Sequence, residues 1–134
     1  MSADKGNQWY DGDWEELVDR AEEILTEVAS RPGAGRKRNT TFYSELNEDL
    51  EEPFDLGSWR GRKGIAVLLA EVSKQSHADR GRMLSAVVLS KSGGMPGQGF
   101  FELAREQGWM THGVRDVDFF IEELRLVHAE YRED

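Results

Sequence analysis

The stretch MLSAVVLSKSGGMPGQGFFELAREQG (residues 83–108) decides the fold that we expect of this chain. Its apolar run, residues 83–89, is rich in valine and leucine and predicts a buried strand. A glycine-dense loop follows over residues 90–99, and its Gly93-Gly94 pair is a tight-turn signal. The chain then enters an aromatic-led helix over about residues 99–107, which Gly108 is expected to end.

The rest of the chain predicts a mainly helical domain. Asp13, with Glu16 three residues later, has the spacing of a capping box. Apolar residues at helical spacing predict a helix after this cap, and Arg31-Pro32-Gly33 is expected to end it. Further helices are expected over about residues 42–50, 61–76 and 114–131, listed here in chain order.

The order of these elements is helix, helix, strand, glycine-rich turn and a second apolar segment that begins with Phe100-Phe101. This order is the plan of a winged helix. We therefore expect a mainly α fold with minor β structure and a short β-hairpin. The winged-helix-like core would span residues 40–108, with helices added before and after it. Residues 1–12 are polar and expected to be flexible, and residues 13–134 are expected to form one domain.

Composition limits the possible functions. The 134 residues include 26 Asp+Glu and 17 Lys+Arg, and the net charge of −9 argues against a general nucleic-acid binder. Cysteine is absent from the sequence, which excludes disulfides and cysteine-ligated zinc and suits a cytoplasmic protein. No run approaches the roughly 18–20 apolar residues of a membrane span, and no apolar signal core begins the sequence. We expect a cytoplasmic protein without a membrane partner.

Basic residues nevertheless gather in two short clusters, namely Arg36, Lys37 and Arg38, and then Arg60, Arg62 and Lys63. The second cluster stands at the start of an expected helix, where cations oppose the helix dipole. In a winged helix, this end of the recognition helix contacts phosphates and base edges. A local basic face on an acidic chain is therefore one interpretation, and exposed, solvent-screened charge is the other.

No motif for catalysis, nucleotide binding or metal binding is present. The loop lacks the Gly-Lys-Ser/Thr of a phosphate-binding P-loop, and its glycines run in the reverse order of a dinucleotide fingerprint. The histidines, His77, His112 and His128, lack the i, i+4 spacing of a helical zinc site. We therefore expect a non-enzymatic protein with no catalytic residue, no metal and no cofactor.

Three segments carry a resemblance to a known family: TFYSEL (41–46), RKGIA (62–66), and LSAVVL (84–89) followed by Gly93-Gly94. Together they resemble the winged-helix DNA-binding domain of the O6-alkylguanine-DNA alkyltransferases and alkyltransferase-like proteins, over residues 40–108. The resemblance implies that Tyr43 contacts the DNA backbone and that an arginine near Arg62 intercalates. The family's Pro-Cys-His-Arg segment corresponds to Leu84-Ser85-Ala86-Val87-Val88, which has no Cys or His, so the chemistry excludes alkyl transfer.

Two functions remain open, beside a third interpretation as an enzyme with an unfamiliar site, which no motif supports. The first is a non-enzymatic DNA-binding or DNA-sensing winged helix that contacts duplex DNA through Arg36, Lys37, Arg38, Tyr43, Arg60, Arg62 and Lys63. The second is an acidic protein-interaction module, such as an immunity protein, an antitoxin or a regulatory subunit, which the net charge favours. Its contact surface for a protein partner would be the glycine-rich loop, with Lys91, Met95, Gln98 and Phe101.

Overall fold

The computed structural model describes residues 7–33 and 38–132. The fold is mainly helical with minor β structure, as expected. In chain order the elements are α1 (Trp14–Ser30), β1 (Thr41–Phe42), α2 (Tyr43–Asp49), α3 (Trp59–Arg80), the 3-10 helix η1 (Leu84–Val87), β2 (Val88–Leu89), α4 (Gln98–Glu106) and α5 (Asp116–Tyr131).

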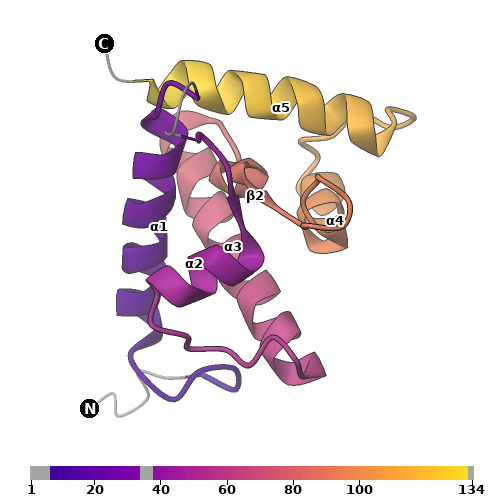
Figure 1. Cartoon of the computed structure of the whole chain (residues 1–134). Helices are drawn as coiled ribbons and strands as arrows, with labels where there is room; N and C mark the ends of the chain where they lie inside the picture. The colour runs from indigo at the N-terminus through magenta and orange to yellow at the C-terminus, as the bar shows by residue number, and fades with distance from the viewer. Residues whose placement is uncertain (1–6, 34–37, 133–134) are drawn as a thin grey trace.

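The long helix α3 organises the domain. In Figure 1, α1 and α3 lie side by side, α5 crosses at one end of α1, and α4 lies beside α3. The 3-10 helix η1 contacts α1, α3 and α5. The short strand β2 leads from η1 into the glycine-rich loop and then into α4. This arrangement places η1 at the centre of the fold.

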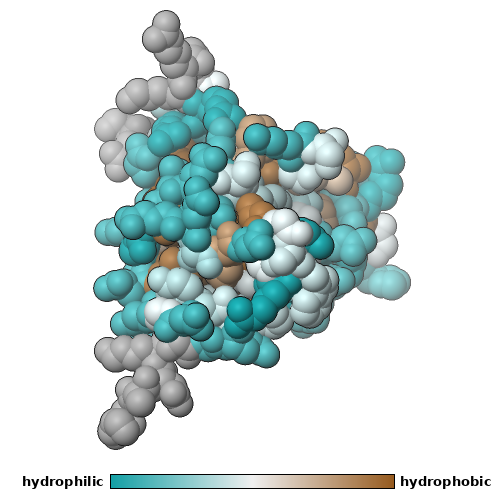
Figure 2. All heavy atoms as spheres, turned by 60° about the horizontal axis from the view of Figure 1, so that its bottom comes forward, coloured by the Kyte–Doolittle hydropathy of each residue, from teal (hydrophilic) through white to brown (hydrophobic). Residues whose placement is uncertain are grey.

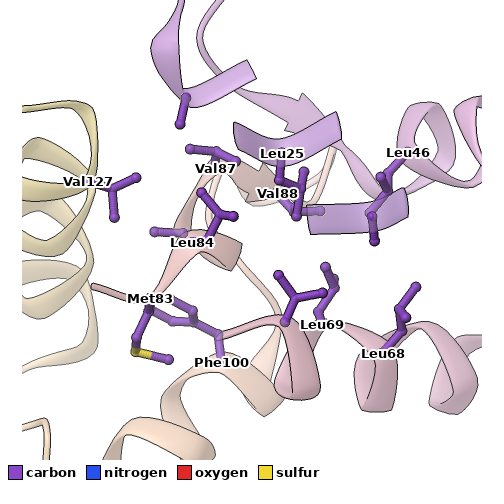
Figure 3. Packing of buried hydrophobic residues seen from close by; sticks show 14 of the residues in the cluster. Leu25, Leu46, Leu68, Leu69, Met83, Leu84, Val87, Val88, Phe100 and Val127 are labelled. Carbon is purple, nitrogen blue, oxygen red and sulfur yellow. The ribbon is translucent and has the colours of Figure 1, made fainter. Parts of the chain in front are cut away.

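The hydrophobic core draws on all of the larger elements. Figure 3 shows Leu25 from α1, Leu46 from α2, Leu68 from α3 and Val127 from α5 around Leu84 of η1. Each of these side chains is fully buried. Burial of a leucine or valine side chain contributes about 1.5–3 kcal/mol, so this cluster is the main stabilising feature of the domain.

The apolar run of residues 83–89 is buried as expected except at the half-buried Leu89, but the prediction of a continuous strand is wrong. Leu84–Val87 winds into η1, and only Val88–Leu89 forms a strand. Two serines of α3 replace the hydrogen bonds of a strand neighbour: Ser76 Oγ accepts from Leu84 N at 3.0 Å, and Ser73 Oγ accepts from Ser85 N at 3.1 Å. A short apolar run indicates burial without deciding between a strand and a helical turn.

The expected β-hairpin is also wrong. β1 pairs with β2 in parallel, with Thr41 opposite Val88 and Phe42 opposite Leu89. Parallel strands need a long crossover connection, and α2, α3 and η1 supply it. The glycine-rich loop closes on itself, because Ser90 N donates to Met95 O at 2.8 Å and Gly94 N to Ser90 O at 2.8 Å. In the described residues the loop leads into α4 and forms no wing.

The helix starts follow their capping residues. Asp13 accepts from Glu16 N at 3.2 Å, which confirms the predicted cap of α1. Ser58 Oγ accepts from Gly61 N at 3.0 Å and caps α3, which begins at Trp59, two residues before the predicted start. The helix ends at Arg80, four residues after the predicted end, because Gly81 adopts the left-handed conformation with φ 74°. The cations Arg60, Arg62 and Lys63 therefore occupy its first turns.

Residues 7–12, assigned to a flexible N-terminus in the sequence analysis, pack across the start of α3. The Trp9 ring lies edge-on to the Trp59 ring, with centroids 6.1 Å apart. The Tyr10 ring packs at an angle against the Phe54 ring, with centroids 6.3 Å apart. Arg60 donates a hydrogen bond to the carbonyl oxygen of Gln8. The two aromatic side chains give this otherwise polar segment apolar surface to bury.

A histidine–tryptophan stack at the end of α3 yields a pH prediction. The His77 ring lies on the Trp109 ring, with centroids 3.7 Å apart and planes 11° apart. Burial, and then the positive charge of Arg82, lower the pKa of His77 below its usual 6.5. Because the folded protein binds this proton less readily than the unfolded chain does, the protein is most stable above about pH 6.5, where His77 is neutral in both states. This stability is lost as the pH falls through the pKa of His77 in the folded protein.

We therefore expect the wild type to lose more stability than His77→Gln between about pH 7.5 and about pH 5. Urea unfolding of both proteins at each pH measures the difference. An equal loss in the two proteins would show that His77 does not titrate in this way.

Candidate functional site

A cleft of about 490 Å³ opens between α2, α3, β2 and α4. The residues that line it come from four separate parts of the chain: Phe42, Tyr43, Ser44, Leu56, Arg62, Ile65, Ala66, Leu69, Ala70, Ser85, Leu89, Ser90, Lys91, Gly97, Gln98, Gly99, Phe100 and Leu103. Figure 2 shows a face of the molecule that is mostly hydrophilic, with hydrophobic atoms visible only in small separate areas. The cleft differs from this hydrophilic face because its walls are apolar, and apolar walls are typical of ligand sites.

The walls of the cleft are apolar because two helices turn small and large hydrophobic residues toward it. Ile65, Ala66 and Leu69 of α3 share one side of that helix at i, i+1 and i+4. Phe100 and Leu103 of α4 face them from across the cleft. Gly99 faces Ala66 with room to spare, since a Cβ built on Gly99 would lie at an ordinary contact distance of 3.9 Å from the Ala66 Cβ.

Tyr43 connects α2 to the glycine-rich loop at the edge of the cleft. Its hydroxyl oxygen accepts a hydrogen bond from Gly97 N at 2.6 Å. Burial raises the pKa of Tyr43, and the Gly97 hydrogen bond offsets part of the rise. The hydroxyl therefore keeps its proton at neutral pH. A Cβ built on Gly97 would lie only 3.1 Å from the Tyr43 hydroxyl oxygen, so glycine suits this close approach.

Two cations border the apolar walls. Arg62 Nη1 donates to the carbonyl oxygen of Leu56 at 3.2 Å. Lys91 Nζ lies 5.6 Å from the centroid of the Phe42 ring, and the Arg38 guanidinium lies 5.4 Å from the same centroid. Arg38 is itself bound to Glu45, with Nη2 and Oε1 2.8 Å apart. Arg62 and Lys91 thus supply the positive charge of the cleft.

Four cations in this region are not neutralised by the rest of the domain. Within residues 7–33 and 38–132, no carboxylate lies within 4.0 Å of Arg60, Arg62, Lys63 or Lys91. Arginines on other elements are paired, for example Arg82 with Glu123 and Arg105 with Asp116. Unpaired positive charge therefore lies at the cleft, on Arg62 and Lys91, while Arg60 and Lys63 occupy the first turns of α3 outside the cleft lining.

The structure brings together residues that the sequence assigned to two different surfaces. Tyr43 and Arg62, from the expected DNA face, line the same cleft as Lys91 and Gln98, from the expected loop surface. Lys63 is exposed on α3 and does not line the cleft. It lies on the same side of the helix as the lining residue Ala70, seven residues later. Arg36 and Lys37 lie outside the described residues, so the first basic cluster is represented by Arg38 alone.

The assignment of Phe101 to an exposed loop surface is wrong. Phe101 is only 4% exposed, and its ring lies edge-on to Phe100 with centroids 5.0 Å apart. It is buried because α4 begins at Gln98 and turns both aromatic residues into the core. Met95 is half-buried against that core, while Lys91 and Gln98 are exposed. The loop therefore lacks the aromatic anchor expected for a protein partner.

Several lining residues were not predicted from sequence. Phe42, Leu56 and Ser85 border the cleft although each belongs to a segment expected to be structural. For Ser85 a signal was present, since a serine inside an apolar run needs a partner when buried. Its hydroxyl lies 2.6 Å from that of Ser73. Phe42 and Leu56 carry no such local signal.

The remaining candidate chemistry is sparse. In the described part of the chain, no group of three or more histidine or acidic residues is placed to hold a metal ion. His128 contacts the carbonyl oxygen of Asn39 through Nε2 at 2.8 Å, which gives it a structural partner. None of the described helices combines the length and hydropathy of a membrane span.

Comparison with known proteins adds no assignment. No protein-family model matches the chain, and searches of curated proteins and of solved structures find no match either.

Proposed function

We propose that this chain binds duplex DNA without catalysing a reaction. The observation that carries the proposal is the pair of unpaired cations Arg62 and Lys91 at one cleft, with Lys63 exposed on the same helix as Arg62, on a chain with a net charge of −9. A cation that contacts a phosphate releases a counterion from the DNA, and this release drives binding. Because the chain as a whole is acidic, binding would be local to this group.

The resemblance to alkyltransferase-like domains supports the same face. It implies a backbone contact for Tyr43 and an intercalating arginine at Arg62, and these two residues line one cleft. The segment corresponding to the reactive Pro-Cys-His-Arg is η1, whose Ser85 also lines the cleft. Without a thiol, this segment has no group for alkyl transfer, so the proposal is for binding alone.

The contributions of the basic residues should differ. Arg60, Arg62, Lys63 and Lys91 are all free of carboxylates among the described residues, and Arg60 and Arg62 each donate to a backbone carbonyl oxygen, of Gln8 and Leu56. Arg38 is bound to Glu45 and would have to exchange that partner for a phosphate. Phosphate contacts from these residues would position the domain rather than read the base sequence. We therefore expect the largest effects at Arg62.

Fluorescence anisotropy with a labelled duplex, measured over a salt series, tests the proposal. If about four phosphates are contacted, affinity should fall about 100-fold between roughly 50 and 200 mM salt. Arg62→Glu should weaken binding at least about tenfold at low salt, because it removes one phosphate contact and introduces repulsion.

Lys74→Glu is the matched control. Lys74 is exposed on α3, does not line the cleft, and undergoes the same change of charge. An equal loss in the two variants would mean that net charge alone matters. Absence of binding at about 20 mM salt, where electrostatic attraction is strongest, would overturn DNA binding altogether.

A further inference from the structure

The cleft has the size of a small-molecule site. Its volume of about 490 Å³ lies within the roughly 300–1,000 Å³ of typical ligand pockets. Side chains of Ile65, Leu69, Phe100 and Leu103 provide apolar walls on two sides. Such walls favour a ligand whose body is apolar, since its burial removes hydrophobic surface from water.

The polar groups around the cleft are mainly hydrogen-bond donors. Arg62 uses one N–H on the Leu56 carbonyl oxygen, so most of its five donors are available. Lys91 carries three donors and has no ion-pair partner among the described residues. The Tyr43 hydroxyl accepts from Gly97, and no described residue accepts its proton. Gln98, at the first position of α4, adds an amide.

Acceptors of comparable strength are missing from the lining. The sequence contains 26 Asp+Glu residues, but the described residues that line the cleft include none of them. The Ser85 and Ser90 hydroxyls are bonded to Ser73 and Ser92, at 2.6 and 3.0 Å. A cationic ligand would therefore meet two positive side chains and no counter-charge, whereas an anionic ligand would meet donors.

We propose that the cleft binds a small organic anion, namely an apolar body that carries a single carboxylate. The body lies between Leu69 and Phe100, and the carboxylate faces Arg62 and Lys91. Hydrogen bonds between charged partners are about twice as strong as neutral ones, so the acid group decides affinity and orientation. This inference goes beyond DNA binding, because the ligand occupies the hollow and needs no phosphate backbone.

Three probes with the same bicyclic ring test the charge requirement: indole-3-acetate, the neutral indole-3-acetamide and the cationic tryptamine. Each is titrated into the ¹⁵N-labelled full-length chain at neutral pH, and amide shifts are followed by NMR. We expect indole-3-acetate to bind at least about tenfold more tightly than the amide and tryptamine not to bind. The shifts should map to residues 62–70 and 97–103.

Substitutions then test the two cations. Arg62→Met and Lys91→Met should each weaken the binding of indole-3-acetate at least about fivefold. Neither substitution should change the binding of indole-3-acetamide. Lys74→Met is the control, because it removes an exposed cation that lies outside the cleft. Circular dichroism of each variant verifies the fold.

Equal affinity for the three probes would overturn the proposal, and so would shifts that map away from the cleft. An equal loss in Lys74→Met would also overturn it, since a general charge effect would then explain the binding.

Discussion

Replacing Gly61 by alanine should lower the free energy of unfolding by about 3 kcal/mol or more. A Cβ at this position would lie 1.8 Å from the carbonyl oxygen of Asp55 and 2.4 Å from its carbonyl carbon. Both are backbone atoms, so no side-chain rotation relieves the overlap. Helix propensity alone would predict the opposite change in the free energy of unfolding, because it favours alanine over glycine by about 0.5–1 kcal/mol.

The Asp55 carbonyl is itself fixed in place. Its oxygen accepts from Ser58 N at 3.1 Å and from Ser58 Oγ at 3.0 Å. Ser58 Oγ in turn caps α3 by accepting from Gly61 N. A shift large enough to admit the methyl group would therefore break the cap as well as the turn. The basic residues at the start of α3 depend on this same junction for their positions.

Gly99→Ala is the matched control for Gly61→Ala. Gly99 is also in the first turn of a helix, but its added Cβ would meet only Ala66 Cβ, at an ordinary 3.9 Å. We expect Gly99→Ala to be neutral or to stabilise by up to about 1 kcal/mol. Urea unfolding followed by circular dichroism compares the two variants. Equal stabilities would show that the residue 54–55 segment yields more readily than the geometry implies.

Replacing Glu123 by leucine should cost about 2–4 kcal/mol of folding free energy. Glu123 is only 6% exposed on α5 and joins that helix to the entry of η1. Its Oε2 accepts from Met83 N at 2.8 Å, and its Oε1 lies 3.1 Å from Arg82 Nη1. Leucine leaves the buried Met83 N–H without an acceptor and Arg82 without its ion pair.

Two further variants separate these effects. Glu123→Gln keeps an acceptor for Met83 N and should cost less than leucine. Glu122→Gln removes an exposed carboxylate that pairs with Arg125, and we expect it to change stability by no more than about 0.5 kcal/mol. Thermal and urea unfolding rank the three proteins. A loss at Glu122 as large as that at Glu123 would contradict the role of burial.

The titration of Glu123 predicts a pH dependence. Burial raises the pKa of Glu123 above its usual 4.5, despite the opposing effects of Met83 N–H and Arg82. With a raised folded-state pKa, the protonated carboxyl stabilises the fold most below about pH 4.5, and this contribution is lost as the pH rises through the folded value. The wild type should therefore gain stability relative to Glu123→Gln as the pH falls from about 7 to 4.5.

The candidate site was only partly predictable. Tyr43 and Arg62 could be singled out because their segments resemble a DNA-binding domain, and Lys91 and Gln98 because they flank a glycine-rich loop. Their meeting in one cleft could not be predicted, since the Tyr43 hydroxyl reaches Gly97 across 54 residues of sequence. That none of the described lining residues is acidic is likewise a property of the assembled surface.

The sequence by itself determined the helical character of the domain, because caps and apolar periodicity act within a few residues. Asp13 begins α1 and Arg31-Pro32-Gly33 ends it, both as predicted. The tertiary structure alone decided how the apolar run of residues 83–89 folds and which strand it meets. Burial among three helices and hydrogen bonds to the Ser73 and Ser76 hydroxyls favour η1. The strand β2 then pairs with β1, from which it is separated in the chain by α2 and α3. These contacts join residues far apart in the chain, and local sequence patterns do not encode them.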